Sequence, residues 1–110
     1  MPLKVCSLYS GSSGNSTLIA GENTKILIDC GVSAKAEELA LFNVGVRPES
    51  IKGIFITHEH SDHIKGVGIM SRKYNIPIYA NEKTWEAMES KIGDVSLSCR
   101  RYIKSGSETY

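Results

Sequence analysis

The sequence has few of the features that mark secreted proteins, membrane proteins or proteins that coat nucleic acid. Its 110 residues include three cysteines, widely spaced and without a CxxC pair, so neither a disulfide framework nor a cysteine zinc site is indicated. No apolar run approaches the ~20 residues that span a bilayer, and no signal peptide precedes the first strand-like segment. The net charge of +1 gives no overall attraction to nucleic acid or to a membrane surface. These absences predict a cytoplasmic protein with reduced thiols and no membrane partner.

The length fits a single domain, and the residue pattern predicts an α/β (α+β) fold. Short β-like runs at 3–8, 17–20 and 25–29 are separated by Gly and Asn turns, which favours an antiparallel opening. Further on, the pattern alternates between strands and helices. Strands are predicted at 51–57, 76–80 and 100–104, and helices at about 33–45, 67–74 and 81–93. Pro77 predicts that its strand lies near a sheet edge or begins there.

The helix predicted at 33–45 is less regular than the other two. Ser33 suits its N-cap, and Glu37 and Glu38 lie near its positive end. Its expected apolar stripe consists of Leu39, Ala40 and Phe42. The helix at 81–93 has Asn81 as its cap, Gly93 as its stop, and an apolar face made of Trp85, Met88 and Ile92.

All three histidines of the chain lie within one six-residue segment, H-x-H-x-D-H, formed by His58, His60, Asp62 and His63. Random placement would give this spacing in roughly one chain in two thousand. Histidine is the commonest metal ligand near neutral pH. The segment also follows an apolar strand, at the carboxyl edge where α/β sheets bind ligands. The pattern therefore favours a metal site over a histidine-rich loop without metal.

The spacing within this segment predicts two metal positions. His58 and His60 are two residues apart, so an extended backbone points them the same way. Asp62 and His63 are adjacent and can face a second point nearby. Two divalent ions there would share a water and lower its pKa to about 7. Zinc suits this donor set, and manganese and iron remain open.

Residues 57–66 resemble the signature of the metallo-β-lactamase superfamily, since they read Thr-His-Glu-His-Ser-Asp-His-Ile-Lys-Gly. Upstream, Leu27-Ile28-Asp29-Cys30-Gly31 resembles the family's first motif. The opening, from Cys6 to the Ser-Gly-rich run 10–16, is similar to the YycJ (VicX, WalJ) branch, bacterial cytoplasmic hydrolases regarded as DNA exonucleases. The resemblance implies that residues 1–110 form a single partial domain. That domain would be the N-terminal half of an αββα four-layer sandwich.

The resemblance also implies roles for individual residues. His58 and His60 would bind the first metal, and Asp62 and His63 the second. Asp62 would in addition position the water nucleophile, which makes it the catalytic candidate. Asp29 would orient the histidine loop, as supporting carboxylates commonly do, and Thr57 is expected beside it. For Asp29 a plain turn cap at Gly31 is an equal alternative.

Ser12, Ser13 and Asn15 lie in the Ser-Gly-rich loop and admit two interpretations. They form a hairpin loop selected for its turn chemistry, or they form a rim of the active site whose hydroxyls and amide meet a phosphate.

The family's remaining ligands, a histidine, a bridging aspartate and a last histidine, have no counterpart in these residues. No histidine follows His63, and the only later aspartate is Asp94. Catalytic zinc normally has three protein ligands plus water, and this chain offers two to each ion. We therefore expect a fragment truncated at its C-terminus, with weak metal binding and little activity alone. We also expect an apolar sheet face where the missing half would pack, open to self-association.

The resulting hypothesis is a metal-dependent phosphodiesterase, most specifically a 5′–3′ DNA exonuclease, with DNA or another phosphodiester as substrate. One alternative is a thioester hydrolase of the glyoxalase II type or a β-lactam hydrolase, although the latter is usually exported. Another is a non-catalytic metal-binding or interaction module that keeps half of the site.

Overall fold

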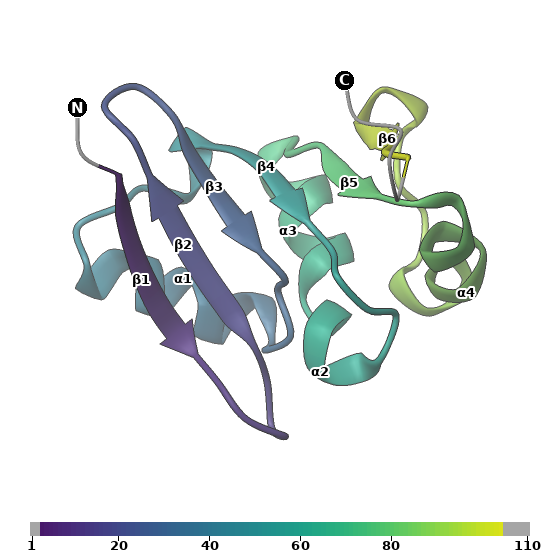
Figure 1. Ribbon diagram of the computed structural model, residues 1–110, viewed down its shortest axis with the longest axis horizontal. Coiled ribbons are helices and arrows are strands. Elements are labelled where there is room, and N and C mark those ends of the chain that lie inside the picture. Colours follow the sequence, from purple (N-terminus) through teal and green to yellow (C-terminus); the bar gives the residue numbers. More distant parts are fainter. Residues whose placement is uncertain (1–2, 105–110) are drawn as a thin grey trace.

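The computed structural model describes residues 3–104, which form a six-stranded sheet with helices packed on one face (Figure 1). The strands are β1 (Lys4–Tyr9), β2 (Ser16–Ala20), β3 (Lys25–Ile28), β4 (Ile51–Phe55), β5 (Ile78–Ala80) and β6 (Arg100–Tyr102). The helices are α1 (Ala34–Asn43), α2 (Ser61–Ile64), α3 (Val67–Tyr74) and α4 (Glu82–Ile92), with 3-10 turns η1 (Pro48–Ser50) and η2 (Leu97–Cys99).

The sheet changes from antiparallel to parallel along the chain. β1–β2 and β2–β3 pair antiparallel, whereas β3–β4, β4–β5 and β5–β6 pair parallel. Each parallel pair needs a crossover, and α1, α2 with α3, and α4 provide these connections. The predicted α/β architecture with an antiparallel opening is thus confirmed. Because β3 and β4 run in the same direction, the loops that leave their carboxyl ends emerge side by side.

Alternate side chains divide the sheet into a covered and an open face. The covered face contributes Leu18, Leu27, Ile54 and Ile78 to one hydrophobic core with the helices. The open face carries Val5, Ile19, Ile26, Ile28, Phe55 and Tyr79, as the register places them. Phe55 and Tyr79 stack there with ring centroids 4.4 Å apart. Within residues 3–104 no helix covers this face (Figure 1); self-association through it stays a prediction.

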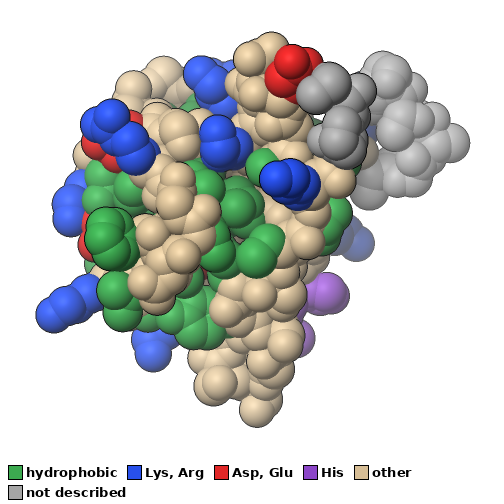
Figure 2. Space-filling model, turned by 90° about the vertical axis from the view of Figure 1, so that its left-hand side faces the viewer, with side chains coloured by type: hydrophobic (Ala, Val, Ile, Leu, Met, Phe, Trp, Pro, Cys, Tyr) green, Lys and Arg blue, Asp and Glu red, His purple; other side chains and the backbone are tan. Residues whose placement is uncertain are grey.

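Helix α1 begins as predicted but buries a different face. The Ser33 hydroxyl accepts a hydrogen bond from the Ala36 amide at 3.2 Å, which confirms the N-cap. The predicted apolar stripe is wrong, since Leu39 is 58% exposed and Phe42 77%. The helix packs through positions 34, 37 and 41, so Glu37, which lies near the positive end of the helix as expected, is buried. Figure 2, seen from the β1 side, shows that hydrophobic side chains gather on this part of the protein surface.

The later elements follow the sequence pattern closely. Asn81 caps α4, since its side chain accepts from the Thr84 amide at 2.8 Å, and Gly93 ends the helix. The face made of Trp85, Met88 and Ile92 is buried. Pro77 directly precedes β5, a strand with neighbours on both sides, so Pro77 marks a strand start and not an edge. No helix within residues 3–104 has the length and apolar character needed to cross a membrane.

Candidate metal centre

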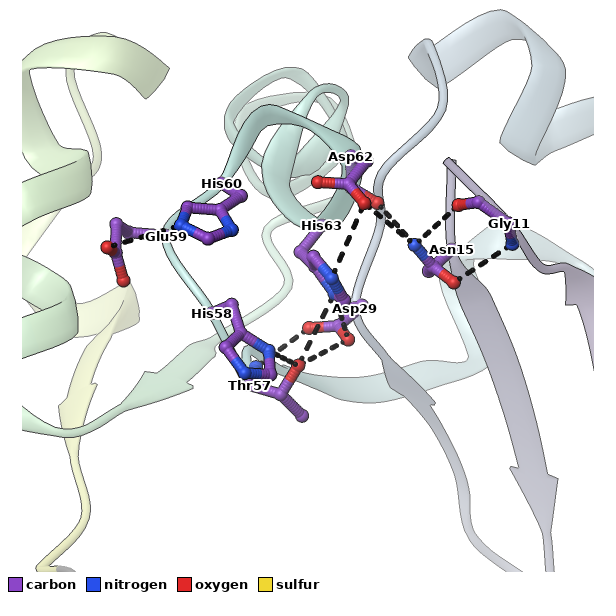
Figure 3. A network of polar contacts seen from close by, with 9 residues as sticks. All are labelled: Gly11, Asn15, Asp29, Thr57, His58, Glu59, His60, Asp62 and His63. Carbon is purple, nitrogen blue, oxygen red and sulfur yellow. Dashed lines mark hydrogen bonds and ion pairs between the residues drawn. The ribbon is translucent and has the colours of Figure 1, made fainter. Parts of the chain in front are cut away.

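Three loops meet at the carboxyl edge of β3 and β4 (Figure 3). Asp29 directly follows β3. Residues 57–63, called here the histidine loop, run from the loop after β4 into α2, so that Asp62 and His63 lie on the first residues of this short helix. The third loop joins β1 to β2 and contains residues 10–15. Backbone hydrogen bonds join the first two loops: the Cys30 amide donates to the His63 carbonyl at 2.9 Å, and the Gly66 amide donates to the Cys30 carbonyl at 3.0 Å. The close pairing of Ile28 with Phe55 in the sheet sets this juxtaposition.

Asp29 turns its carboxylate toward the histidine loop. Its φ of 66° lies in the left-handed region, which aspartate tolerates better than most residues. Oδ1 accepts a hydrogen bond from the Thr57 amide at 2.7 Å, and Oδ2 accepts from the Thr57 hydroxyl at 2.6 Å. Oδ2 also lies 2.8 Å from Nδ1 of His63. Asp29 is buried, and its carboxylate contacts the histidine loop, whereas its supporting role at a metal stays a prediction.

His63 is fixed between two carboxylates. Donation of its Nδ1 proton to Asp29 leaves the lone pair on Nε2. That nitrogen lies 3.6 Å from Oδ2 of Asp62. Metal-bound histidines characteristically donate their other nitrogen to a carboxylate in this way, which sets the tautomer and the ring orientation. The geometry therefore leaves one imidazole nitrogen and one carboxylate oxygen facing the same point.

Asp62 is held in turn by the loop between β1 and β2. The Asn15 side-chain amide donates to Oδ2 of Asp62 at 3.2 Å and to its carbonyl at 3.1 Å, and the Asn15 backbone amide donates to the same carbonyl at 2.8 Å. Gly31 closes the contact, since its amide donates to the Asn15 carbonyl at 2.9 Å. A Cβ on Gly31 would lie 1.8 Å from the Asp62 carbonyl oxygen, so only glycine fits.

His58 and His60 have fewer contacts. Nδ1 of His58 lies 3.0 Å from the Thr57 hydroxyl, and its ring centroid is 6.1 Å from that of His60. Nε2 of His60 is 3.9 Å from the Glu59 carboxylate, and 69% of the His60 side chain is exposed. Figure 3 shows His60 turned away from the Asp29 cluster.

The Ser-Gly-rich loop separates into two parts. Ser12 and Ser13 are exposed at its tip, where a ligand could reach them. Asn15 is half-buried, and its amide is engaged with Gly11 and Asp62. Asn15 thus contacts both its own loop and Asp62, and a substrate role for any of the three residues stays a prediction.

The donor set matches zinc in chemistry but not in number. Imidazole nitrogen and carboxylate oxygen are ordinary zinc ligands, and Asp29 leaves Nε2 of His63 ready for a cation. Within residues 3–104, however, no three His, Cys, Asp or Glu side chains lie close enough together to hold a metal ion. These residues thus fit part of a metal centre, and the ligand roles of His58, His60, Asp62 and His63 stay predictions.

The sequence pattern of the Metallo-beta-lactamase superfamily matches residues 9–106. The chain belongs to the metallo-β-lactamase superfamily. Within this superfamily it is 47% identical over 95 residues to the exodeoxyribonuclease YycJ of Bacillus anthracis, covering 86% of this chain and 36% of that protein. It is 46% identical over 101 residues to the exodeoxyribonuclease WalJ of Streptococcus pneumoniae, covering 90% and 38%. The chain therefore spans little more than a third of the length of either relative.

Solved structures of metallo-β-lactamase superfamily proteins share the fold. A β-lactamase from Chitinophaga pinensis superposes with a TM-score of 0.68 at 20% identity, over 84% of this chain and 40% of that one. At this identity the likeness concerns the fold alone. The six-stranded sheet with its helices corresponds to part of the metallo-β-lactamase fold, as the resemblance implied.

Two features of the site were not predicted from the sequence: the contact of Gly31 with Asp62, and the link from Asn15 to Asp62. The partners Asn15 and Asp62 are 47 residues apart. The only available signal was the presence of Asn15 in the Ser-Gly-rich run 10–16 and of Gly31 in the motif 27–31. Neither motif indicates which distant residue it contacts.

Proposed function

We propose that this chain forms part of a metal-dependent phosphodiesterase that degrades DNA from its 5′ end. The observation that carries the proposal is the placement of His63 between Asp29 and Asp62, which prepares Nε2 and a carboxylate oxygen for one cation. The two exodeoxyribonucleases that are 46–47% identical support DNA as the substrate class.

Each residue at the loop junction has a distinct part in this proposal. Asp62 and His63 would hold one divalent ion, and His58 and His60 the other. Bound divalent ions supply a water of lowered pKa and positive charge beside a phosphoryl oxygen. Thr57 holds the Asp29 carboxylate by two hydrogen bonds, Asp29 would keep the proton of His63 on Nδ1, and Asn15 holds the Asp62 carboxylate in place. Zinc fits these donors, with manganese or iron as alternatives.

Positive charge beside the histidine loop supports a phosphate-bearing substrate. The Lys91 ammonium lies 3.5 Å from the Glu59 carbonyl, and Lys65 is exposed two residues after His63. Contacts between lysine ammonium groups and phosphate oxygens position a nucleic-acid backbone without reading its sequence. Ser12 and Ser13, at the exposed loop tip, are further candidates for phosphate contact.

Complementation tests the proposal, because the remaining ligands must come from outside these residues. The chain is assayed alone and together with the C-terminal remainder of the Bacillus anthracis exodeoxyribonuclease, with zinc or manganese. The substrates are 5′-labelled duplex DNA, a thioester and a chromogenic cephalosporin. We expect metal-dependent release of nucleotides from the 5′ end of DNA in the mixture, and at least ~100-fold less from the chain alone.

Matched variants define which result supports the proposal. His63→Ala should abolish the complemented activity, whereas Glu22→Gln, in the exposed turn between β2 and β3, should leave it unchanged. Faster hydrolysis of the thioester or the cephalosporin than of DNA would favour the other hydrolases. Metal binding without any hydrolysis in the folded mixture would favour the non-catalytic module.

A further inference from the structure

Helix α1 carries a carboxyl group that solvent does not reach. Glu37 is 0% exposed, and its Oε2 accepts a hydrogen bond at 2.8 Å from the hydroxyl of Ser16, itself 1% exposed. Its other oxygen, Oε1, has no hydrogen-bond partner within the described residues. Buried polar atoms are nearly always satisfied, so a carboxyl kept here calls for an explanation beyond the filling of space.

The neighbours of Glu37 are the residues that follow the two supporting side chains of the site. Ser16 follows Asn15, which holds Asp62, and Cys30 follows Asp29, which holds His63. The Cys30 thiol is fully buried against Glu37: burial first, and then the Glu37 charge, raises its pKa well above the usual value. One side chain of α1 therefore lies against the first residue of β2, Ser16, and against Cys30, and each of these residues directly follows a supporting residue of the site.

Backbone hydrogen bonds connect the residues beside Glu37 to the two candidate ligands Asp62 and His63. The amide of Asn15 donates to the Asp62 carbonyl at 2.8 Å, and the amide of Cys30 donates to the His63 carbonyl at 2.9 Å. A shift of either loop away from Glu37 would lengthen one of these bonds and move the corresponding side chain.

We propose that Glu37 is a positioning residue, which holds the Asn15 and Asp29 loops in the register that fixes Asp62 and His63. Its importance for hydrolysis rests on the proposed function, whereas the positioning itself does not. The other buried side chains of α1, Ala34 and Leu41, can only fill space. Glu37 instead accepts a hydrogen bond from a residue at the start of β2, and so ties α1 to a specific point on that strand.

The chemistry of Glu37 identifies glutamine as its conservative replacement. Burial is the largest influence on the carboxyl and raises its pKa, while the hydrogen bond from Ser16 opposes the shift. A glutamine is uncharged, has nearly the same shape and retains an oxygen for the Ser16 hydroxyl. Leucine has a similar volume but offers no acceptor.

Amide hydrogen exchange of the metal-free full chain, followed by NMR, tests the proposal. The Asn15 and Cys30 amides report the two loop contacts directly, and the Ile54 and Ile56 amides, which donate to Pro77 and Tyr79, report the sheet. In Glu37→Leu we expect exchange about tenfold faster at Asn15 and Cys30, with the sheet amides unchanged. Glu37→Gln should match the parent chain at all four.

The histidine ring supplies a second readout. In the parent chain and in Glu37→Gln, the imidazole proton of His63 should reside on Nδ1, whereas Glu37→Leu should give a mixture of tautomers. Glu38→Leu is the matched control, since Glu38 is the next residue of α1 but contacts Lys73 and Tyr74 of α3. It should alter neither the loop amides nor the His63 tautomer.

A uniform acceleration at all four amides in Glu37→Leu, no acceleration at all, or an equal loss in Glu37→Gln would each overturn the proposal. If Glu37→Leu does not fold, Ser16→Ala replaces it, with faster exchange expected at Asn15 and not at the sheet amides. These measurements need neither metal nor substrate. If the complementation assay shows no hydrolysis, the exchange and tautomer measurements still test whether Glu37 positions the loops. If those measurements contradict the role of Glu37, the hydrolase proposal is not affected.

Discussion

His60 and His63 belong to the same short loop, yet 69% of the His60 side chain is exposed and only 18% of His63. His63 contacts the buried Asp29, and its neighbour Asp62 is hydrogen-bonded by Asn15. The His60 side chain lies 3.9 Å from the carboxylate of the adjacent Glu59, and its ring centroid is 6.1 Å from that of His58. The two ends of the loop thus differ in how far the protein itself fixes their side chains.

This difference indicates that the two proposed metal positions are prepared to different degrees. At the Asp62–His63 end, the Asp29 carboxylate contacts Nδ1 of His63 and so favours one tautomer of that ring. Backbone hydrogen bonds from Asn15 and Cys30 also hold the main chain of Asp62 and His63. At the His58–His60 end, rotation of exposed side chains must be lost when an ion binds, which weakens binding. We therefore expect Asp62 and His63 to bind first when zinc is added, and the following variants test this comparison.

Removal of Asp29 should have the largest effect. Asp29→Ala takes away both Thr57 contacts and the partner of Nδ1 of His63, so zinc affinity at the Asp62–His63 end should fall about 100-fold. A zinc titration followed through the histidine NMR signals measures it. Asp29→Asn, which keeps one acceptor oxygen for the Thr57 amide, should lose less. Unchanged affinity in Asp29→Ala would mean that the contacts seen at His63 do not prepare it.

Gly31→Ala should follow, because it forces apart the loops that carry Asp29 and Asp62. The added Cβ would meet the Asp62 carbonyl oxygen at 1.8 Å and the Asn15 amide at 2.8 Å, both backbone atoms. We expect the free energy of unfolding in urea to fall by about 2 kcal/mol. Gly21→Ala is the control, since its Cβ would meet nothing closer than 3.7 Å. A loss of equal size in both variants would contradict the close-approach argument.

Asn15→Ala should have a smaller effect, concentrated at Asp62. It removes the side-chain hydrogen bonds to Asp62 but keeps the backbone bond, so unfolding should become easier by about 1 kcal/mol. Chemical denaturation of this variant and of Ser12→Ala, from the exposed tip of the same loop, provides the comparison. The Ser12 variant should stay within about 0.5 kcal/mol of the parent chain. If the two variants behave alike, Asn15 does not anchor Asp62.

His60→Ala should have the smallest effect on the metal-free chain. Its side chain is mostly exposed, so thermal or urea unfolding should change by less than about 0.5 kcal/mol. The corresponding His63→Ala removes a buried contact to Asp29 and should cost more. A larger loss for His60 than for His63 would reverse the comparison between the two ends.

The sequence predicted those parts of the fold that depend on local chemistry. Asn81 and Ser33 cap their helices as expected, because an N-cap is decided within one turn. The face of α4 is also a local property, since three large apolar residues repeat at helical spacing. The H-x-H-x-D-H segment marked the candidate site for the same reason, since its residues are close in sequence.

What the sequence could not predict depends on contacts between distant segments. The buried side of α1 includes Glu37 and excludes Phe42, and the Ser16 hydroxyl gives the Glu37 carboxylate a hydrogen bond at a place where an apolar contact was expected. Hydrophobicity alone assigns that helix the wrong face. The role of Gly31 likewise depends on a loop that arrives from another part of the chain.

The sheet order described above, β1 through β6 in chain order, bears on how the protein is made. Among the described residues, each of the strands β2 to β6 pairs with the strand that directly precedes it in the sequence. The antiparallel pairs β1–β2 and β2–β3 close short loops, whereas each parallel pair must close a longer crossover that contains a helix, which slows its formation. The sheet can grow from the β1–β2 hairpin, and Asp29, which directly follows β3, precedes the histidine loop in the sequence and can be in place before that loop packs beside it.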